Sequence, residues 1–147
     1  MKARHGVLAL VLSTACVNQT EETAQSALGV VPATESAVWT RMSANNLPDG
    51  RYSHALAFDE TRQVVVLFGG IAMSSDGSTS AQQDTWEWSP ALGAWKDRTS
   101  AGTKPAARNG AAMAYDSVRD KFVLFGGRAG SGYDYQDTWE WDPKTGV

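Results

Sequence analysis

A short polar stretch near the C-terminus holds the side chains best suited to recognising another molecule. Residues 128–135 read Arg-Ala-Gly-Ser-Gly-Tyr-Asp-Tyr, which places Arg128, Tyr133, Asp134 and Tyr135 close together in sequence. A guanidinium binds carboxylates or phosphates through paired hydrogen bonds. A tyrosine combines an apolar ring with a hydroxyl group. These four residues could therefore contact a sugar, a peptide or an acidic group; the alternative is that they are solvated loop side chains.

Catalysis needs groups that converge on one point, and the sequence contains no strong set of them. His54 is the one histidine beyond the N-terminal segment, which favours a structural or surface role over metal ligation or proton transfer. Glu87 and Glu140 occupy equivalent repeated positions, which predicts a scaffold role rather than one acid–base pair. The glycine-rich run 126–132 lacks the lysine and the helix of a phosphate-binding loop. We therefore expect no catalytic residue, no metal ligand and no cofactor.

Composition and charge narrow the class of partner. The chain has 147 residues, 42% of them hydrophobic and 20% charged, and a net charge of -3. Such a chain offers no basic surface to neutralise phosphates, which argues against nucleic acid as a partner. Six Trp and fourteen Gly indicate short strands with tight turns and bulky packing between strands.

The first fifteen residues have the pattern of an export signal. Lys2 and Arg4 give a positive start, residues 7–12 form a short apolar core, and residues 13–15 are small. The apolar run is too short to span a membrane as a helix. We expect residues 1–15 to act as a signal peptide and the protein to be exported.

Cys16 follows this segment directly and is the one cysteine of the chain. The stretch Leu-Ser-Thr-Ala-Cys resembles the lipobox of bacterial lipoproteins, although that family prefers an apolar residue where Ser13 stands. The resemblance implies lipidation of Cys16 and attachment to the membrane of the cell envelope, which needs more than one acyl chain to be stable. Simple cleavage before Cys16, giving an extracellular protein, is the alternative. Residues 16–37 have the composition of a flexible tether.

An internal repeat organises the rest of the chain. Residues 51–70 match residues 108–127 at ten of twenty positions, with an offset of 57. Residues 83–90 match residues 136–143 at seven of eight positions, with an offset of 53. The difference of four residues falls in the segment between the matched parts, as expected for a loop within a repeated structural unit.

Each copy of the repeat predicts a series of antiparallel strands. Residues 64–68 form a continuous apolar run, which indicates a strand covered on both faces. Trp86 and Trp88 share one face of a later strand and can fill the space between two sheets. The expected strands are 53–59, 64–68, 84–88 and 94–98 in the first copy and 110–116, 122–125 and 137–141 in the second. Asp59 and Asp116 end equivalent strands and are expected to organise turns.

The repeated residues resemble the kelch motif in order and spacing. In the first copy they are Arg51, Gly69, Gly70, Asp84, Trp86 and Trp95; in the second they are Arg108, Gly126, Gly127, Asp137 and Trp139. In kelch proteins each repeat is one four-stranded blade of a β-propeller, typically with 4–8 blades. The resemblance implies an all-β, partial kelch-type propeller over 38–147, with four-stranded antiparallel blades at about 51–98 and 108–147.

The second blade is expected to lack its outer strand. Trp95 follows Gly93 by two residues, whereas only Val147 follows Gly146. Since repeat proteins need roughly three repeats for stability, we expect a fragment of a larger propeller. Assembly of several short chains into one ring is the alternative. Residues 38–41 resemble the region around Trp95 and are expected to form a lone outer strand.

The topology of a blade predicts where recognition takes place. In an antiparallel blade, the loop after the second strand and the crossover to the next blade emerge at the same end. Segments 71–82, 99–107 and 128–135 should therefore share one rim, and they are polar and rich in Gly and Ser. We expect a non-enzymatic binding scaffold of the bacterial envelope or exterior that recognises a protein or a glycan through these loops.

An enzyme is the rival hypothesis. Some kelch propellers resemble galactose oxidase, whose copper site needs His and Tyr ligands and a Tyr–Cys crosslink. Cys16 lies beside the export signal and the folded part has a single histidine, so these residues lack that site. A galactose-oxidase-like or other sugar-modifying active site would have to lie in further blades.

Overall fold

A computed structural model describes residues 38–42 and 45–146 of the chain. The chain divides into two units, Met1–Arg41 and Met42–Val147, and the ten strands formed by the described residues lie in the second. The predicted signal peptide, Cys16 and the predicted tether lie outside the described residues. The residues that are described contain no helix of the length and hydropathy needed to cross a membrane.

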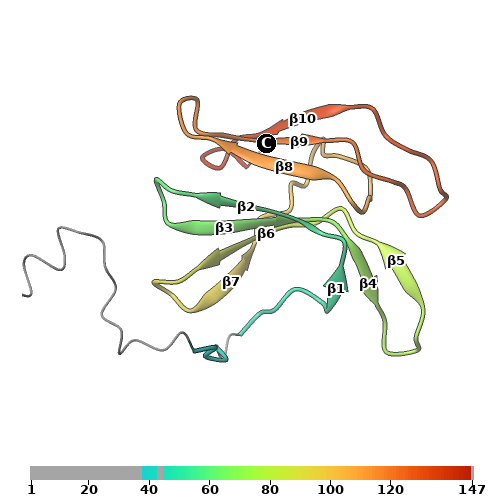
Figure 1. The fold of residues 1–147 in the computed structure, drawn as a ribbon, viewed down its shortest axis with the longest axis horizontal. Coiled ribbons are helices and arrows are strands. Elements are labelled where there is room, and N and C mark those ends of the chain that lie inside the picture. The colour runs from blue at the N-terminus through green and yellow to red at the C-terminus, as the bar shows by residue number, and fades with distance from the viewer. Residues whose placement is uncertain (1–37, 43–44, 147) are drawn as a thin grey trace, which may run out of the picture. The chain divides into compact units, whose positions relative to one another are not determined.

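The first repeat folds into a four-stranded antiparallel sheet, here called blade 1 (Figure 1). Its strands, in spatial order, are β2 (Ala55–Asp59), β3 (Val64–Phe68), β6 (Thr85–Ser89) and β7 (Ala94–Asp97). The register sets Leu67 opposite Trp86 and Trp88 opposite Trp95. At the β2–β3 turn the carboxylate of Asp59 accepts hydrogen bonds from the backbone N–H groups of Thr61 and Arg62, which confirms its predicted role in the turn.

The second repeat forms the same sheet without the outermost strand. Blade 2 consists of β8 (Ala112–Asp116), β9 (Lys121–Phe125) and β10 (Thr138–Trp141). These strands pair as β2, β3 and β6 do in blade 1, and β10 takes the place of β6. Asp116 closes its turn through the N–H groups of Val118 and Arg119, as Asp59 does. The all-β fold with an incomplete second blade is therefore confirmed within the described ranges.

A small third sheet corrects the prediction that residues 71–82 form a plain loop. β1 (Arg51–Tyr52) pairs with β4 (Ile71–Met73), and β4 pairs with β5 (Thr79–Ala81). Figure 1 shows this hairpin extending from one end of blade 1. The second repeat keeps only two isolated bridges here, Asn109–Arg128 and Arg128–Asp134. The first repeat is four residues longer in this segment, which lengthens the hairpin enough to form a ladder.

Each blade has two unlike faces, because side chains alternate across a strand. The face with the tryptophans is here called the aromatic face. In blade 1 it carries Leu56, Phe58, Val65, Leu67, Trp86, Trp88 and Trp95, and in blade 2 Met113, Tyr115, Phe122, Leu124, Trp139 and Trp141. The opposite face is here called the aliphatic face. In blade 1 it carries Ala55, Ala57, Val64, Val66, Phe68, Thr85 and Glu87, and in blade 2 Ala112, Ala114, Val123, Phe125, Thr138 and Glu140.

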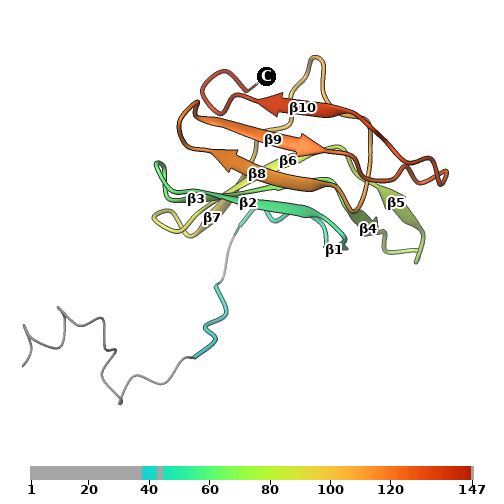
Figure 2. The same ribbon diagram turned by 45° about the horizontal axis from the view of Figure 1, so that its top comes forward.

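The core lies between the aliphatic face of blade 1 and the aromatic face of blade 2. Figures 1 and 2 show the two sheets stacked, with β2 beside β8. Val66 is 0% exposed and Phe122 is 1% exposed. Trp139 packs on the cluster formed by Phe68 and Leu124, in the place between blades that was predicted for the tryptophans.

The lone outer strand predicted at residues 38–41 is not formed. These residues have no regular structure, and Trp39 is fully exposed. An isolated strand has no partner for its backbone groups, so a Trp95-like sequence alone does not produce one.

Candidate functional site

A buried arginine supports the loop rim of blade 2. The side chain of Arg108 is fully buried and forms a bidentate ion pair with Asp137, with 2.9 Å between Nη2 and Oδ2. Its Nη1 also donates to the carbonyl oxygen of Gly126 at 2.8 Å and its Nε to that of Ala106 at 3.0 Å. Trp139 Nε1 donates to Asp137 at 2.7 Å. The repeated Arg, Gly, Asp and Trp positions thus form one hydrogen-bonded unit.

Blade 1 contains the same unit. Arg51 donates to both carboxylate oxygens of Asp84, at 2.6 and 2.9 Å, and to the carbonyl oxygen of Gly69 at 3.0 Å. Trp86 Nε1 donates to Asp84 at 2.7 Å. The Arg, Gly, Asp and Trp residues make the same contacts in both blades, at the end of the sheet where the rim loops begin. This geometry is that of a structural support for the rim.

Of the four predicted ligand residues, one has a half-buried side chain that supports the loop, and three have exposed side chains. Tyr135 is half-buried, and the guanidinium carbon of Arg108 lies 4.0 Å from the centroid of its ring. Tyr133 is 64% exposed and meets Tyr135 edge to face, with ring centroids 5.4 Å apart. Arg128 and Asp134 form an exposed ion pair with 2.8 Å between Nε and Oδ1. The cluster formed by Arg128, Tyr133 and Asp134 is here called the rim cluster.

Two of the three predicted rim segments lie side by side. A methyl group placed on Gly130 would lie 3.8 Å from Cβ of Ala81 in β5, so segments 71–82 and 128–135 are in contact range. The third segment, 99–107, has a different place. Ser100, Thr103 and Lys104 line a cavity together with core residues between the blades, so this crossover also covers the core.

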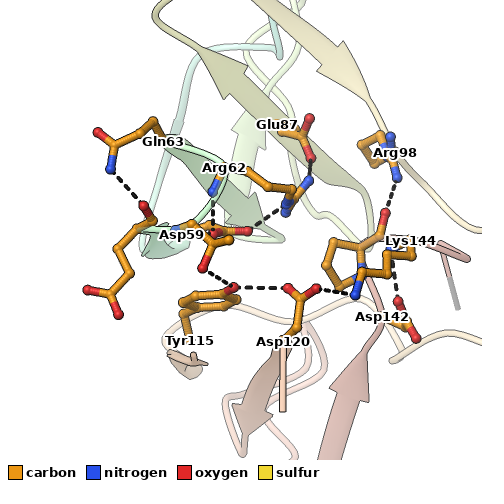
Figure 3. Close-up of polar contacts among 12 residues, drawn as sticks. Asp59, Arg62, Gln63, Glu87, Arg98, Tyr115, Asp120, Asp142 and Lys144 are labelled. Atoms are coloured by element: carbon orange, nitrogen blue, oxygen red, sulfur yellow. Dashed lines mark hydrogen bonds and ion pairs between the residues drawn. The ribbon is translucent and has the colours of Figure 1, made fainter. Parts of the chain in front are cut away.

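A polar network lies at the ends of the strands opposite the rim (Figure 3). Asp59 is fully buried, and Arg62 joins it to Glu87 with N–O distances of 2.6 Å to each. From blade 2, the hydroxyl of Tyr115 lies 3.3 Å from Oγ1 of Thr61. The network therefore links both blades.

Blade 2 continues this network with a second set of charges. The hydroxyl of Tyr115 donates to Asp120 at 2.9 Å, and Lys144 pairs with Asp120 at 2.8 Å. The hydrogen bond from Lys144, followed by that from Tyr115, lowers the pKa of Asp120. The bond to Thr61 favours ionisation of Tyr115, but desolvation and the nearby carboxylates outweigh it and raise the pKa of the hydroxyl. A protonated tyrosine and ion-paired carboxylates bridge the blades here; they are poorly suited to act as a base or nucleophile.

Arg62 and Arg119 are structural residues that the sequence reasoning missed. Arg119 pairs with Asp116 at 2.7 Å and with Glu140 at 2.6 Å, and so repeats the Asp59–Arg62–Glu87 arrangement. The scaffold role predicted for both glutamates agrees with these contacts. The signal was present, because Arg62 and Arg119 are identical residues at the offset of 57.

No metal centre is found among residues 38–42 and 45–146. That part of the chain contains no group of three or more His, Cys, Asp or Glu side chains placed to hold a metal ion. His54 is half-buried, and its Cβ would lie 2.9 Å from a methyl group on Gly70, which places it in the tight junction behind the rim.

We expect the protein to lose stability as the pH falls from about 4 to about 2. The hydrogen bonds from Arg108 lower the pKa of Asp137 to about 2. At Asp84 burial raises the pKa, but the hydrogen bonds from Arg51 and Trp86 outweigh it, so this pKa is also lowered. A carboxyl group with a lowered folded-state pKa stabilises the fold above its unfolded pKa, and this stabilisation is lost as the pH falls through the folded value. Urea unfolding followed by tryptophan fluorescence at several pH values measures the effect.

The control for this titration is Asp137→Asn, which removes one titrating group. Its unfolding midpoint should depend less on pH between about 4 and 2 than that of the wild type. Equal pH dependence in the two proteins would show that the Arg108–Asp137 pair makes no contribution.

One comparison with known proteins shows the family of the chain, and another shows its fold. A family model described as KLHDC2/KLHL20/DRC7 Kelch-repeats domain matches residues 10–147. Among solved structures, that of YjhT matches 65% of this chain at 17% sequence identity with a TM-score of 0.52, and this chain spans 36% of its length. No curated protein sequence matches. The family match covers most of the sequence, and the structural likeness shows the same fold: the chain belongs to the kelch-repeat family of β-propeller proteins.

Proposed function

We propose that this chain is a protein-binding scaffold and that the rim cluster is its recognition surface. Membership of the kelch-repeat family supports a scaffold for protein interaction. The observation that carries the proposal is the placement of Tyr133: its ring is 64% exposed yet held edge-on by Tyr135, which stacks on the buried Arg108. A large side chain that is exposed and already positioned loses little conformational entropy on binding.

The ion pair beside Tyr133 supplies specificity for charge. Arg128 and Asp134 are 58% and 70% exposed, so their attraction is worth about 0–1 kcal/mol. A carboxylate of a partner can therefore take the place of Asp134 on the Arg128 guanidinium at little cost. The surface fits a protein segment in which an acidic side chain lies next to an apolar one. A glycan stacked on Tyr133 is the second occupant that this geometry suits.

Replacing both Arg128 and Tyr133 with alanine is expected to reduce partner capture by more than about tenfold, since each central contact of an interface contributes on the order of 1–2 kcal/mol. The measurement is affinity capture with the tagged chain from solubilised cell-envelope protein, quantified by mass spectrometry. Lys96→Ala, an exposed change on β7, is the control. Proteins that bind the wild type and Lys96→Ala but not the double variant support the rim cluster. Equal capture by all three proteins would show that the rim cluster is not the binding site.

A competition experiment distinguishes a protein partner from a glycan. A protein partner should be displaced by a free acidic peptide but not by oligosaccharides.

The proposal includes a place of action outside the cytoplasm, in the bacterial envelope or beyond it. The support for this is the charged, apolar and small-residue order of residues 1–15 followed by Cys16. Expressed in a bacterium and labelled with a radioactive fatty acid, the wild type should incorporate label and Cys16→Ser should not. Export of both proteins without label would favour simple secretion; retention of both in the cytoplasm would contradict export.

A further inference from the structure

The small sheet at the rim ends in a strand with an unpaired edge. β4 lies between β1 and β5, so β5 has a neighbouring strand on one side only among the described residues. Thr79 and Ser80 of this strand are exposed, and Ala81 is half-buried. Figures 1 and 2 show that β5 is the strand of this sheet nearest to the loop between β9 and β10. Both elements that border the edge, the hairpin of blade 1 and the loop of blade 2, lie inside the described repeats.

The register of the hairpin shows which backbone groups point to the free edge. In an antiparallel ladder, residues bonded to the partner strand alternate with residues whose backbone groups point away from it. Ser74 N donates to Ser78 O at 2.8 Å, and the pairing of β4 with β5 continues this alternation to Ser80. The N–H and C=O groups of Thr79 and Ala81 therefore point away from β4. Within the described ranges, no hydrogen bond uses these four groups.

The sequence of β5 does little to keep another chain away. Natural edge strands are protected by charged side chains, proline, bulges or short length. Residues 79–81 contain neither charge nor proline, and they pair with β4 without a bulge. Their one protection is length, because only Thr79 and Ala81 offer outward groups. A partner strand therefore needs a second contact beyond this edge to bind firmly.

The rim cluster provides that second contact and gives the site a charge polarity. A methyl group on Gly130 would lie 3.8 Å from Cβ of Ala81, so the segment that carries Arg128 borders this end of β5. Arg128 is 58% exposed and positively charged. Asp76 lies in the turn at the other end of the hairpin, and hydrogen bonds from the hydroxyl and the N–H of Ser78 lower the pKa of its carboxyl group. An acidic residue of a partner is therefore favoured at the Arg128 end and disfavoured at the Asp76 end.

We propose that the protein partner binds as an extended segment, which adds a strand to the edge of β5 and places an acidic side chain on Arg128. This inference rests on the proposed function of the rim cluster and specifies the conformation and polarity of its partner. Every second residue of the segment exchanges backbone hydrogen bonds with Thr79 and Ala81. A glycan has no amide N–H groups at the two-residue spacing of a strand, so it does not fit this edge.

The test uses peptide probes selected on the full chain. A display library of short random peptides is selected on the wild type, and peptides that do not bind the double variant Arg128→Ala, Tyr133→Ala are synthesised. Each peptide is then N-methylated at one backbone position at a time, which removes one N–H and leaves the side chains unchanged. Affinity should fall by more than about tenfold at every second position and stay unchanged between them. A loss without this alternation would overturn the proposal.

Thr79→Pro is the matching change in the chain. Proline removes the outward N–H and is tolerated on an edge strand when that group faces solvent. This variant should bind the peptides more than about tenfold more weakly, whereas Thr79→Ala, which keeps the N–H, should bind like the wild type. Circular dichroism checks that both variants are folded.

Amide hydrogen exchange in the wild type tests the same contact without a substitution. The amides of Thr79 and Ala81 should exchange rapidly in the free chain and slowly with a peptide bound. The amide of Ser80, which faces β4, should be protected in both states. Unchanged exchange at Thr79 and Ala81 on binding would show that no strand is added.

The outcomes separate this inference from the proposed function. Peptides that depend on Arg128 and Tyr133 but bind Thr79→Pro as tightly as the wild type would support the rim cluster and overturn strand addition. A library that yields no peptide dependent on Arg128 and Tyr133 would contradict both.

Discussion

Replacing Arg108 with alanine should lower the free energy of unfolding by about 3 kcal/mol, because removal of one partner of a buried ion pair leaves the other without compensation. The guanidinium is fully buried, whereas the Asp137 side chain is 38% exposed, so water relieves part of the loss. The substitution also removes the donors to the carbonyl groups of Gly126 and Ala106 and the support beneath Tyr135. The change in urea midpoint, followed by tryptophan fluorescence, measures the effect.

Arg119→Ala is the matched control for this variant. Arg119 is likewise ion-paired, with Asp116 and Glu140, but its side chain is 52% exposed. Exposed pairs contribute about 0–1 kcal/mol, so the urea midpoint of this variant should lie close to that of the wild type. Equal losses in Arg108→Ala and Arg119→Ala would show that burial does not set the strength of these pairs. Arg108→Lys should recover only part of the stability, because an ammonium group cannot form the bidentate contact with Asp137.

The positions of the strands could be predicted because the same residue pattern occurs in both copies of the repeat. The apolar run 64–68 coincides with β3, since a continuous run of large and β-branched residues forms a strand covered on both faces. The three strands that the structure describes in blade 2 agree with the prediction from the position of Gly146 relative to Gly93. These features depend on local pattern, which sequence carries directly.

The rim was predicted less well, because its structure depends on contacts between distant residues. The pattern of residues 71–82 suggested a loop, but β4 in this segment pairs with β1 in an antiparallel β-ladder. Tyr135 and Tyr133 look equivalent in sequence, yet the buried guanidinium of Arg108 takes the face of Tyr135 and leaves Tyr133 exposed. Which side chain supports and which is free depends on a contact across 27 residues, which spacing alone does not reveal.

The glycine pair after β3 illustrates how one motif can serve two environments. Gly69 and Gly126 are equivalent residues with nearly the same backbone angle, φ +63° and φ +66°. A methyl group on Gly69 would lie 2.6 Å from the carbonyl oxygen of Arg108, where blade 2 begins. A methyl group on Gly126 would have its nearest neighbour at 3.4 Å, the carbonyl oxygen of Tyr135. A methyl group would therefore clash with the junction between the blades at Gly69, but would make an ordinary van der Waals contact at Gly126.

Gly69→Ala should consequently destabilise the protein by roughly 3 kcal/mol or more, and Gly126→Ala by only about 1–2 kcal/mol. Both variants incur the cost of a left-handed backbone in a residue with Cβ, and this common term cancels in their difference. What remains is the displacement of the Arg108 carbonyl, which also accepts the hydrogen bond from Gly70 N that joins the two blades. Urea unfolding of the two variants side by side measures this difference. Equal midpoints would mean that the Arg108 carbonyl can move away from the added methyl group at no cost in stability. The packing of blade 2 on blade 1 would then not depend on the close backbone approach at Gly69.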